Sequence, residues 1–156
     1  MSITPSPARV PSAALRTTRL LVPVIALCVL FVSACVPLTD HEGASLGRVN
    51  DARANRGIPR LVPTGDATAK ARDLAHRMAR EGRLIHSTRL SSGLASGWSS
   101  LGENVGMGAN VHQVHDLFMG STQHRRNIVN PGFRTVGVGV AVDGRGRVWV
   151  AQVFVG

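Results

Sequence analysis

Histidine is the residue type in this 156-residue sequence that is best suited to acid–base or metal chemistry, and six histidines are present. The imidazole ring titrates near neutral pH and can ligate a metal through either nitrogen. His112 and His115 stand three residues apart, a spacing that can chelate a metal ion on one face of a helix. We instead expect His112 to face solvent and His115 to lie at the margin of the core. His76 falls on the charged side of a predicted helix and His41 in a predicted tether.

Two serines lie near histidines in the sequence and are candidate nucleophiles. Ser87 follows His86, and Ser121 stands three residues before His124. Neighbours in sequence need not share the geometry that a catalytic serine requires. This pattern therefore gives little support to serine-dependent hydrolysis.

The beginning of the chain has the pattern of a secretory signal that ends at a cysteine. Residues 1–19 are polar and carry three arginines and no acidic residue, and an apolar run follows over 20–35. A basic start, an apolar run and small residues at its end are typical of signal peptides. A membrane-spanning helix is the alternative, but a span needs about 20 apolar residues. This run is shorter and contains Pro23.

Cys35 is the candidate site of lipid attachment. The segment Val32-Ser33-Ala34-Cys35 resembles the lipobox of bacterial lipoprotein signals, with Val32 in place of the usual leucine. The other cysteine, Cys28, lies inside the signal, so the mature chain has no pair for a disulfide. We expect residues 1–34 to be removed, 35–43 to form a lipidated N-terminus and tether, and 44–156 to form one domain. The protein would then be anchored by acyl chains such as palmitate to the extracytoplasmic face of the cell membrane; simple secretion is the alternative.

The composition is strongly basic, with 18 lysine and arginine residues against 9 acidic ones. After residue 34 the net charge is still +6. This charge favours contact with anionic surfaces such as phospholipid head groups or wall polymers. Nucleic acid is the rival partner, but the arginines are scattered among acidic residues and no aromatic platform lies between them. We therefore expect no nucleic-acid binding.

Apolar spacing predicts four helices before residue 130. A modest helix covers 44–56 and ends at Gly57 and Pro59, and the strongest helical period covers 67–79 and ends at Gly82. A third helix covers 111–118, and a short fourth runs from Ser121 or Thr122 to Ile128. Residues 87–102, rich in serine and glycine, are expected to form a loop.

The C-terminus changes to the two-residue period of β-strands. Valines alternate with small residues over 135–142, a turn follows at 143–146, and 147–155 is nearly all apolar. This pattern predicts an antiparallel hairpin whose second strand is buried on both faces. The small face of the first strand, with Gly137 and Gly139, would let a helix approach the backbone closely. Helices followed by a hairpin predict an α+β fold.

Several segments, in this order, resemble the bacterial SCP-like branch of the CAP superfamily (cysteine-rich secretory proteins, antigen five, pathogenesis-related one). They are Asn50-x-x-Arg53, Ala71-x-x-x-Ala75-x-x-Met78, His86-Ser87, Gly102-Glu103-Asn104-Val105-Gly106, His124 to Val129, Phe133, Val136 to Val140, and the closing strand with Trp149, Gln152 and Phe154. The resemblance covers about residues 44–156. It implies a three-layer α-β-α sandwich around a small antiparallel sheet.

In that family a surface cleft holds two histidines and two acidic residues. The resemblance assigns His86 and His124 as the histidines and Glu103 as the first acid. Ser121 stands where the second acid would be.

The neighbours of these residues are expected to support them. Ser87 is one such neighbour, and Asn104 would satisfy backbone groups in a turn after Glu103. Arg125 and Asn127 would fix the chain around His124, and Arg53 would pair with an acidic residue.

Two imidazoles and one carboxylate could hold a divalent metal such as Zn²⁺, with water at an open position where it could be activated for hydrolysis. With one acid missing, a binding role is the stronger expectation. The sequence thus favours an envelope-anchored binding module, not an enzyme, that takes a lipid, glycan, wall-polymer or protein ligand at the His/Glu cleft. The alternatives are a metal-dependent, peptidase-like hydrolase of an envelope component and a structural spacer without a ligand.

Overall fold

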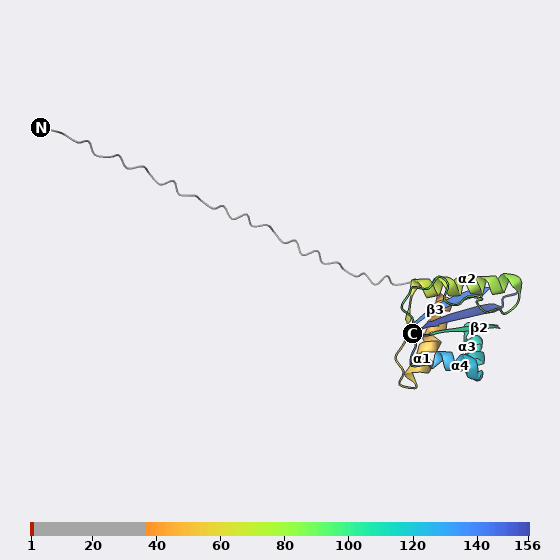
Figure 1. Ribbon diagram of the computed structural model, residues 1–156. Coiled ribbons are helices and arrows are strands. Elements are labelled where there is room, and N and C mark those ends of the chain that lie inside the picture. Colours follow the sequence, from red (N-terminus) through yellow and green to blue (C-terminus); the bar gives the residue numbers. More distant parts are fainter. Residues whose placement is uncertain (2–36) are drawn as a thin grey trace. The chain divides into compact units, whose positions relative to one another are not determined.

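A computed structural model describes Met1 and residues 37–156 of the chain (Figure 1). The predictions of a signal peptide, of a lipid on Cys35 and of the position of Cys28 lie outside these residues. None of the helices in the described part combines the length and the apolar character that crossing a membrane requires.

A four-stranded sheet forms the centre of the domain, with its strands in the order β1, β3, β4, β2. The strands are β1 (Val62–Pro63), β2 (Leu101–Gly108), β3 (Thr135–Val142) and β4 (Val148–Val155). β3 and β4 form the predicted hairpin, and β4 also pairs antiparallel with β2. The expected antiparallel sheet is corrected at one edge, where the short β1 runs parallel to β3.

Helix α2 (Gly65–Glu81) covers one face of the sheet. Its apolar residues at the predicted spacing are buried, except for the partly buried Ala79, and they pack on the β4 side chains of Trp149, Ala151 and Val153. The helix ends at Gly82, which adopts the left-handed conformation with φ 66°. The prediction of this helix from its apolar period is confirmed.

Two glycines of β3 let α2 lie directly on the backbone of the strand. A Cβ atom at Gly137 would come within 1.9 Å of the carbonyl carbon of Ala67, and one at Gly139 within 2.2 Å of that of Ala71. No side chain fits in that space. The expected close approach of a helix to the small face of β3 is therefore confirmed.

Three helices cover the opposite face of the sheet: α1 (Asp40–Ala54), α3 (Val111–Gly120) and α4 (Thr122–Ile128) (Figure 1). Their apolar residues pack with the valines of β3 and with Phe154 of β4. The result is the three-layer α-β-α arrangement of an α+β fold, as the resemblance implied.

The segment that contains Glu103 is a strand, whereas the sequence predicted a loop up to residue 102 and a turn after Glu103. Strand β2 pairs with β4 along its whole length, from Leu101 opposite Val155 to Gly108 opposite Val148. The glycines of β2 have low strand propensity, so the sequence did not indicate a strand here. They leave space for side chains that pack on the strand. A Cβ at Gly106 would lie 2.7 Å from the ring of Phe118.

Helix α1 begins at Asp40, four residues earlier than expected. Thr39 and Glu42 form a reciprocal capping box, in which each side chain accepts a hydrogen bond from the backbone N–H of the other. Such a box fixes the start of a helix because it satisfies backbone donors that the first turn leaves free. Residues 40–43, including the exposed His41, are therefore helical instead of part of a tether.

Candidate functional site

Glu103 and His86 form a hydrogen-bonded pair at the edge strand β2. Oε1 of Glu103 accepts hydrogen bonds from Nδ1 of His86 at 2.7 Å and from the backbone N–H of Ser87 at 2.9 Å. The glutamate side chain is 5% exposed, whereas the imidazole is 59% exposed. Nδ1–H of His86 donates to the carboxylate of Glu103, so Nε2 is the ring nitrogen that is left for an outside partner.

His124 lies on α4 beside the same strand. Its backbone carbonyl accepts a hydrogen bond from Nδ2 of Asn104 at 3.2 Å, and its ring packs on Phe118 with 5.1 Å between ring centroids. Burial lowers the pKa of His124, and the nearby charge of His86 lowers it further. The structure thus brings His86, Glu103 and His124 into one neighbourhood, with His124 held neutral near pH 7.

A network of side-chain hydrogen bonds around the buried Asn104 holds β2, β4 and α4 together beside these residues. Asn127 donates to the side-chain oxygen of Asn104 at 2.9 Å and to the backbone carbonyl of Glu103 at 3.3 Å. Asn104 also donates to Gln152 at 3.1 Å, across the strand pair. Asn104 therefore links β2, β4 and α4 from within a strand, and it does not complete a turn as the sequence suggested. Asn127 holds Asn104, which in turn holds the backbone of His124.

The other supporting residues act on the backbone. Arg125 donates to the carbonyl of Met119 at 2.6 Å and so joins α4 to α3. Ser121 precedes α4, and its side chain forms no capping hydrogen bond. Ser87 contributes its N–H to Glu103, as described above.

Ser45 is not among the serine candidates above, although Gly43-Ala44-Ser45-Leu46-Gly47 matches the Gly-x-Ser-x-Gly pattern. In hydrolases that pattern places the serine on an exposed strand-to-helix turn. Here it lies inside α1, and Ser45 is buried with its hydroxyl 3.4 Å from Nε2 of Gln152. Ser45 is therefore part of the core.

The donor set does not fit a three-ligand metal centre. Among residues 37–156 no three histidine, cysteine, aspartate or glutamate side chains converge on a point that could hold a metal ion. Oε1 of Glu103 is engaged, and Oε2 is buried without a hydrogen-bond partner. Glu103 orients His86 and is not itself placed to ligate an ion together with both histidines.

Within residues 37–156 Arg53 pairs with no acidic residue, contrary to the expectation. The side chain is fully buried. Its guanidinium donates to four backbone carbonyls, those of Pro59, Ile128, Asn130 and Phe133, at 2.7–3.0 Å. Burial lowers the pKa of Arg53, but an arginine in a protein stays protonated. Arg53 thus joins the end of α1 to the segment between α4 and β3.

The remaining histidines follow their predicted exposure. His112 and His76 are exposed, and His115 is buried at the margin of the core. Burial lowers the pKa of His115, and the charge of Arg48 adds to that effect.

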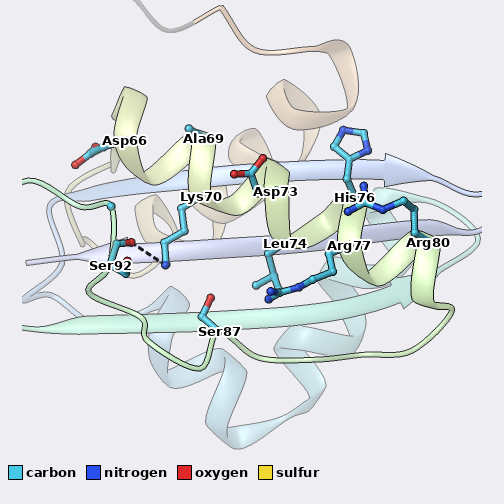
Figure 2. Close-up of a pocket in the computed structure, with 11 residues that line it drawn as sticks. Asp66, Ala69, Lys70, Asp73, Leu74, His76, Arg77, Arg80, Ser87 and Ser92 are labelled. Atoms are coloured by element: carbon cyan, nitrogen blue, oxygen red, sulfur yellow. Dashed lines mark hydrogen bonds between the residues drawn. The ribbon is translucent and has the colours of Figure 1, made fainter.

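A groove of about 560 Å³ runs along α2, on the side of the loop that follows this helix (Figure 2). Its lining includes Ser87 but not the side chains of His86, Glu103 or His124. A second groove of about 420 Å³ adjoins it and is lined by Lys70, Arg77, Ser87, Thr88, Arg89 and Ser92. The sequence did not predict these grooves, because their residues come from a helix and a loop that only the fold brings together.

Residues 46–154 match the sequence profile of the Cysteine-rich secretory protein family, known as CAP. The chain belongs to the CAP family. This match spans the sheet, all four helices except the start of α1, and the His86–Glu103–His124 neighbourhood. No curated protein sequence matches the CAP domain described here significantly.

Solved structures of low sequence identity share the CAP fold. An outer surface protein from Borrelia burgdorferi aligns with a TM-score of 0.66 and 11% identity, over 77% of this chain and 95% of its own. Venom allergen-like protein 4 from Schistosoma mansoni aligns at 0.61 and 11%, over 76% and 89%. An extracellular SCP-domain protein from Bacillus anthracis aligns at 0.61 and 22%, over 76% of this chain but only 44% of its own. At these identities the likeness establishes the fold alone.

Proposed function

We propose that this protein is a lipid-anchored CAP domain of the bacterial envelope that binds a ligand at the His86–Glu103–His124 site and does not catalyse a reaction there. The observation that carries the proposal is that Glu103 forms its hydrogen bonds with groups of the protein itself. Its carboxylate is buried and holds both the His86 ring and the Ser87 backbone. Oε1 thus orients the ring and the loop for recognition, and Oε2 is enclosed away from solvent, so neither oxygen is placed to take a proton from an outside group.

The exposed Nε2 of His86 and the adjoining ring of His124 would be the contact points for the ligand. A neutral imidazole nitrogen accepts hydrogen bonds from hydroxyl or amide groups. Lipid head groups, glycans and peptides all carry such donors. The surface or extracellular relatives from Borrelia and Bacillus support an extracytoplasmic location.

The lipid anchor is supported by the sequence around Cys35, and a contact of Pro37 limits how far the anchor would stand from the domain. The carbonyl oxygen of Pro37 accepts a hydrogen bond from Nη2 of Arg72 on α2 at 2.7 Å. Cys35 is two residues earlier, so the chain can extend only about 7 Å from this point to the cysteine. An acylated Cys35 would hold the domain against the membrane surface.

The anchor is tested by feeding cells labelled palmitate. The wild-type protein should incorporate the label, Cys35→Ala should abolish incorporation, and Cys28→Ala should not. Undiminished labelling of Cys35→Ala would overturn the lipid anchor.

The binding role is tested on the purified protein by metal analysis and by NMR of the histidine rings. We expect less than stoichiometric zinc, no turnover of a peptide library, and shifts of the His86 and His124 ring signals with short-chain phospholipid micelles or a soluble muropeptide. His112→Ala is the matched control, since His112 is exposed on α3. Stoichiometric zinc that is lost in both His86→Ala and His124→Ala, together with peptide turnover, would establish the hydrolase instead.

A further inference from the structure

We propose that the smaller groove beside α2 is a binding site for a phosphate group. It is separate from the His86 ring, although Ser87 borders both. The groove is lined by three cationic side chains and three hydroxyl side chains, and by no carboxylate. A lining made only of cations and hydroxyl donors suits a phosphate, which offers several acceptor oxygens and carries negative charge.

Arg77 is the central residue of this site. Its Nε atom is buried and has no hydrogen-bond partner within the described part of the chain. The other nitrogens of a guanidinium can donate a forked pair of hydrogen bonds to one phosphate group. The same side chain lines both grooves along α2.

Lys70 lies on one side of the site and holds the loop that contains Arg89 and Ser92. Its Nζ donates to the carbonyls of Arg89 at 3.2 Å and Ser92 at 2.9 Å. An ammonium has three donors, so one remains for a ligand. Lys70 and Arg77 both point from α2 toward the loop that carries Ser87 and Ser92 (Figure 2).

The acidic residues of the larger groove do not oppose a phosphate at this end. Asp66 uses both oxygens on backbone N–H groups, those of Ala67 and Ala95, at 2.8 Å. Asp73 projects from the outer side of α2, away from the loop (Figure 2). The charged side chains of the smaller groove are thus Lys70, Arg77 and Arg89.

The volume of about 420 Å³ is within the range of small-molecule sites. It admits a phosphate with its ester substituent as well as the free ion. A phospholipid head group and a soluble phosphate ester share this chemistry. The lipid source rests on the proposed membrane anchor, whereas phosphate binding itself does not.

Phosphate binding is tested by titrating inorganic phosphate into the purified mature protein in detergent, against chloride at equal ionic strength. The signals are the NMR resonances of the backbone N–H groups of Thr88 and Ser92, which line the groove and are present in every variant. We expect saturation, and about a tenfold or greater loss of affinity in Lys70→Gln, Arg77→Gln and Arg89→Gln. The control Arg126→Gln removes the same charge from an exposed position on α4 and should change the affinity less than twofold. Circular dichroism confirms the fold of each variant.

Absence of saturation, or equal weakening by Arg126→Gln, overturns the site. The source is separated with the Cys35→Ala chain, which carries no acyl group to bind membranes by itself. Binding to phosphatidylglycerol vesicles that Lys70→Gln weakens assigns a lipid head group. Binding of glycerol 3-phosphate without binding to vesicles assigns a soluble ester. Failure of palmitate labelling alone leaves the phosphate result standing, so the two proposals fail separately.

Discussion

Nδ1 of His86 lies 2.7 Å from Oε1 of Glu103, and the same oxygen accepts the N–H of Ser87. One buried carboxylate oxygen therefore sets both the tautomer of the ring and the path of the loop. A histidine without such a partner prefers no single orientation, and its loop is free to move. The pair thus fixes the His86 ring and the Ser87 backbone of the candidate site relative to β2.

The tautomer of His86 provides the first prediction. Glu103→Ala should abolish the predominance of the Nδ1-protonated ring and increase the amide exchange rate of Ser87. Glu103→Gln should preserve both, because the amide oxygen can still accept the two hydrogen bonds. Nitrogen-15 NMR of the ring and hydrogen exchange measure these effects. An unchanged tautomer in Glu103→Ala would show that the carboxylate does not set it.

Arg53→Met should destabilise the protein by about 3–5 kcal/mol, because it leaves four backbone carbonyls without their donor. Arg53→Lys should also destabilise it, since a lysine ammonium has three donors and lacks the planar fork. Urea unfolding measures both variants. A loss below about 1 kcal/mol for Arg53→Met would mean that water replaces the guanidinium at these carbonyls.

Gly139→Ala should prevent stable folding, because the new Cβ would lie 2.2 Å from the backbone of Ala71. The expected loss is at least about 4 kcal/mol, the scale of severe core substitutions. Gly144→Ala is the matched control, since nothing lies within 4 Å of a Cβ there. Thermal unfolding compares the two, and a similar melting temperature for both would contradict the packing of α2 on β3.

Stability should fall as the pH is lowered from 6.5 toward 5. The pKa of His115 and that of His124 are both below their ordinary value of 6.5 in the folded protein, chiefly because of burial. The unfolded chain therefore binds more protons in this range, and stability present above pH 6.5 is lost as the pH falls through the lowered values. The carboxylates with lowered pKa values, such as Glu42, titrate from an ordinary value of 4.5 and act only at lower pH.

Urea unfolding at pH 7.5 and at pH 5.5 measures this dependence. His115→Gln should reduce the slope of stability with pH, and the exposed His112→Gln should not. An equal slope in wild type and His115→Gln would assign the dependence to other groups.

The sequence was sufficient for the elements whose residues repeat at a clear period. The alanines, Leu74 and Met78 of α2 and the valines of β3 have spacings that belong to only one kind of element, and both were placed correctly. Strand β2 was missed because Gly102, Gly106 and Gly108 give no strand signal. Those glycines are explained by the side chains that pack on them from α3, from α4 and, at Gly102, from Phe133.

The site was predicted in part, and through family resemblance. Spacing alone could not place His86 beside Glu103, because the two are joined by a loop without a period. The expected pairing of Arg53 with an acid is wrong because the fold surrounds its guanidinium with four backbone carbonyls, from segments that no local pattern brings together. The basic groove was missed because Lys70 and Arg77 look like ordinary solvent-facing charges of a helix.

The glycine contacts between α2 and β3 have a consequence for how tightly a ligand can be held. A helix seated on bare main chain has no intervening side chains that could rearrange, so it cannot roll or slide. The backbone that carries Lys70 and Arg77 is thereby fixed before any ligand arrives, so association orders only their side chains. Changes in the loop opposite them would then alter how long a ligand stays, and would leave the encounter rate nearly constant.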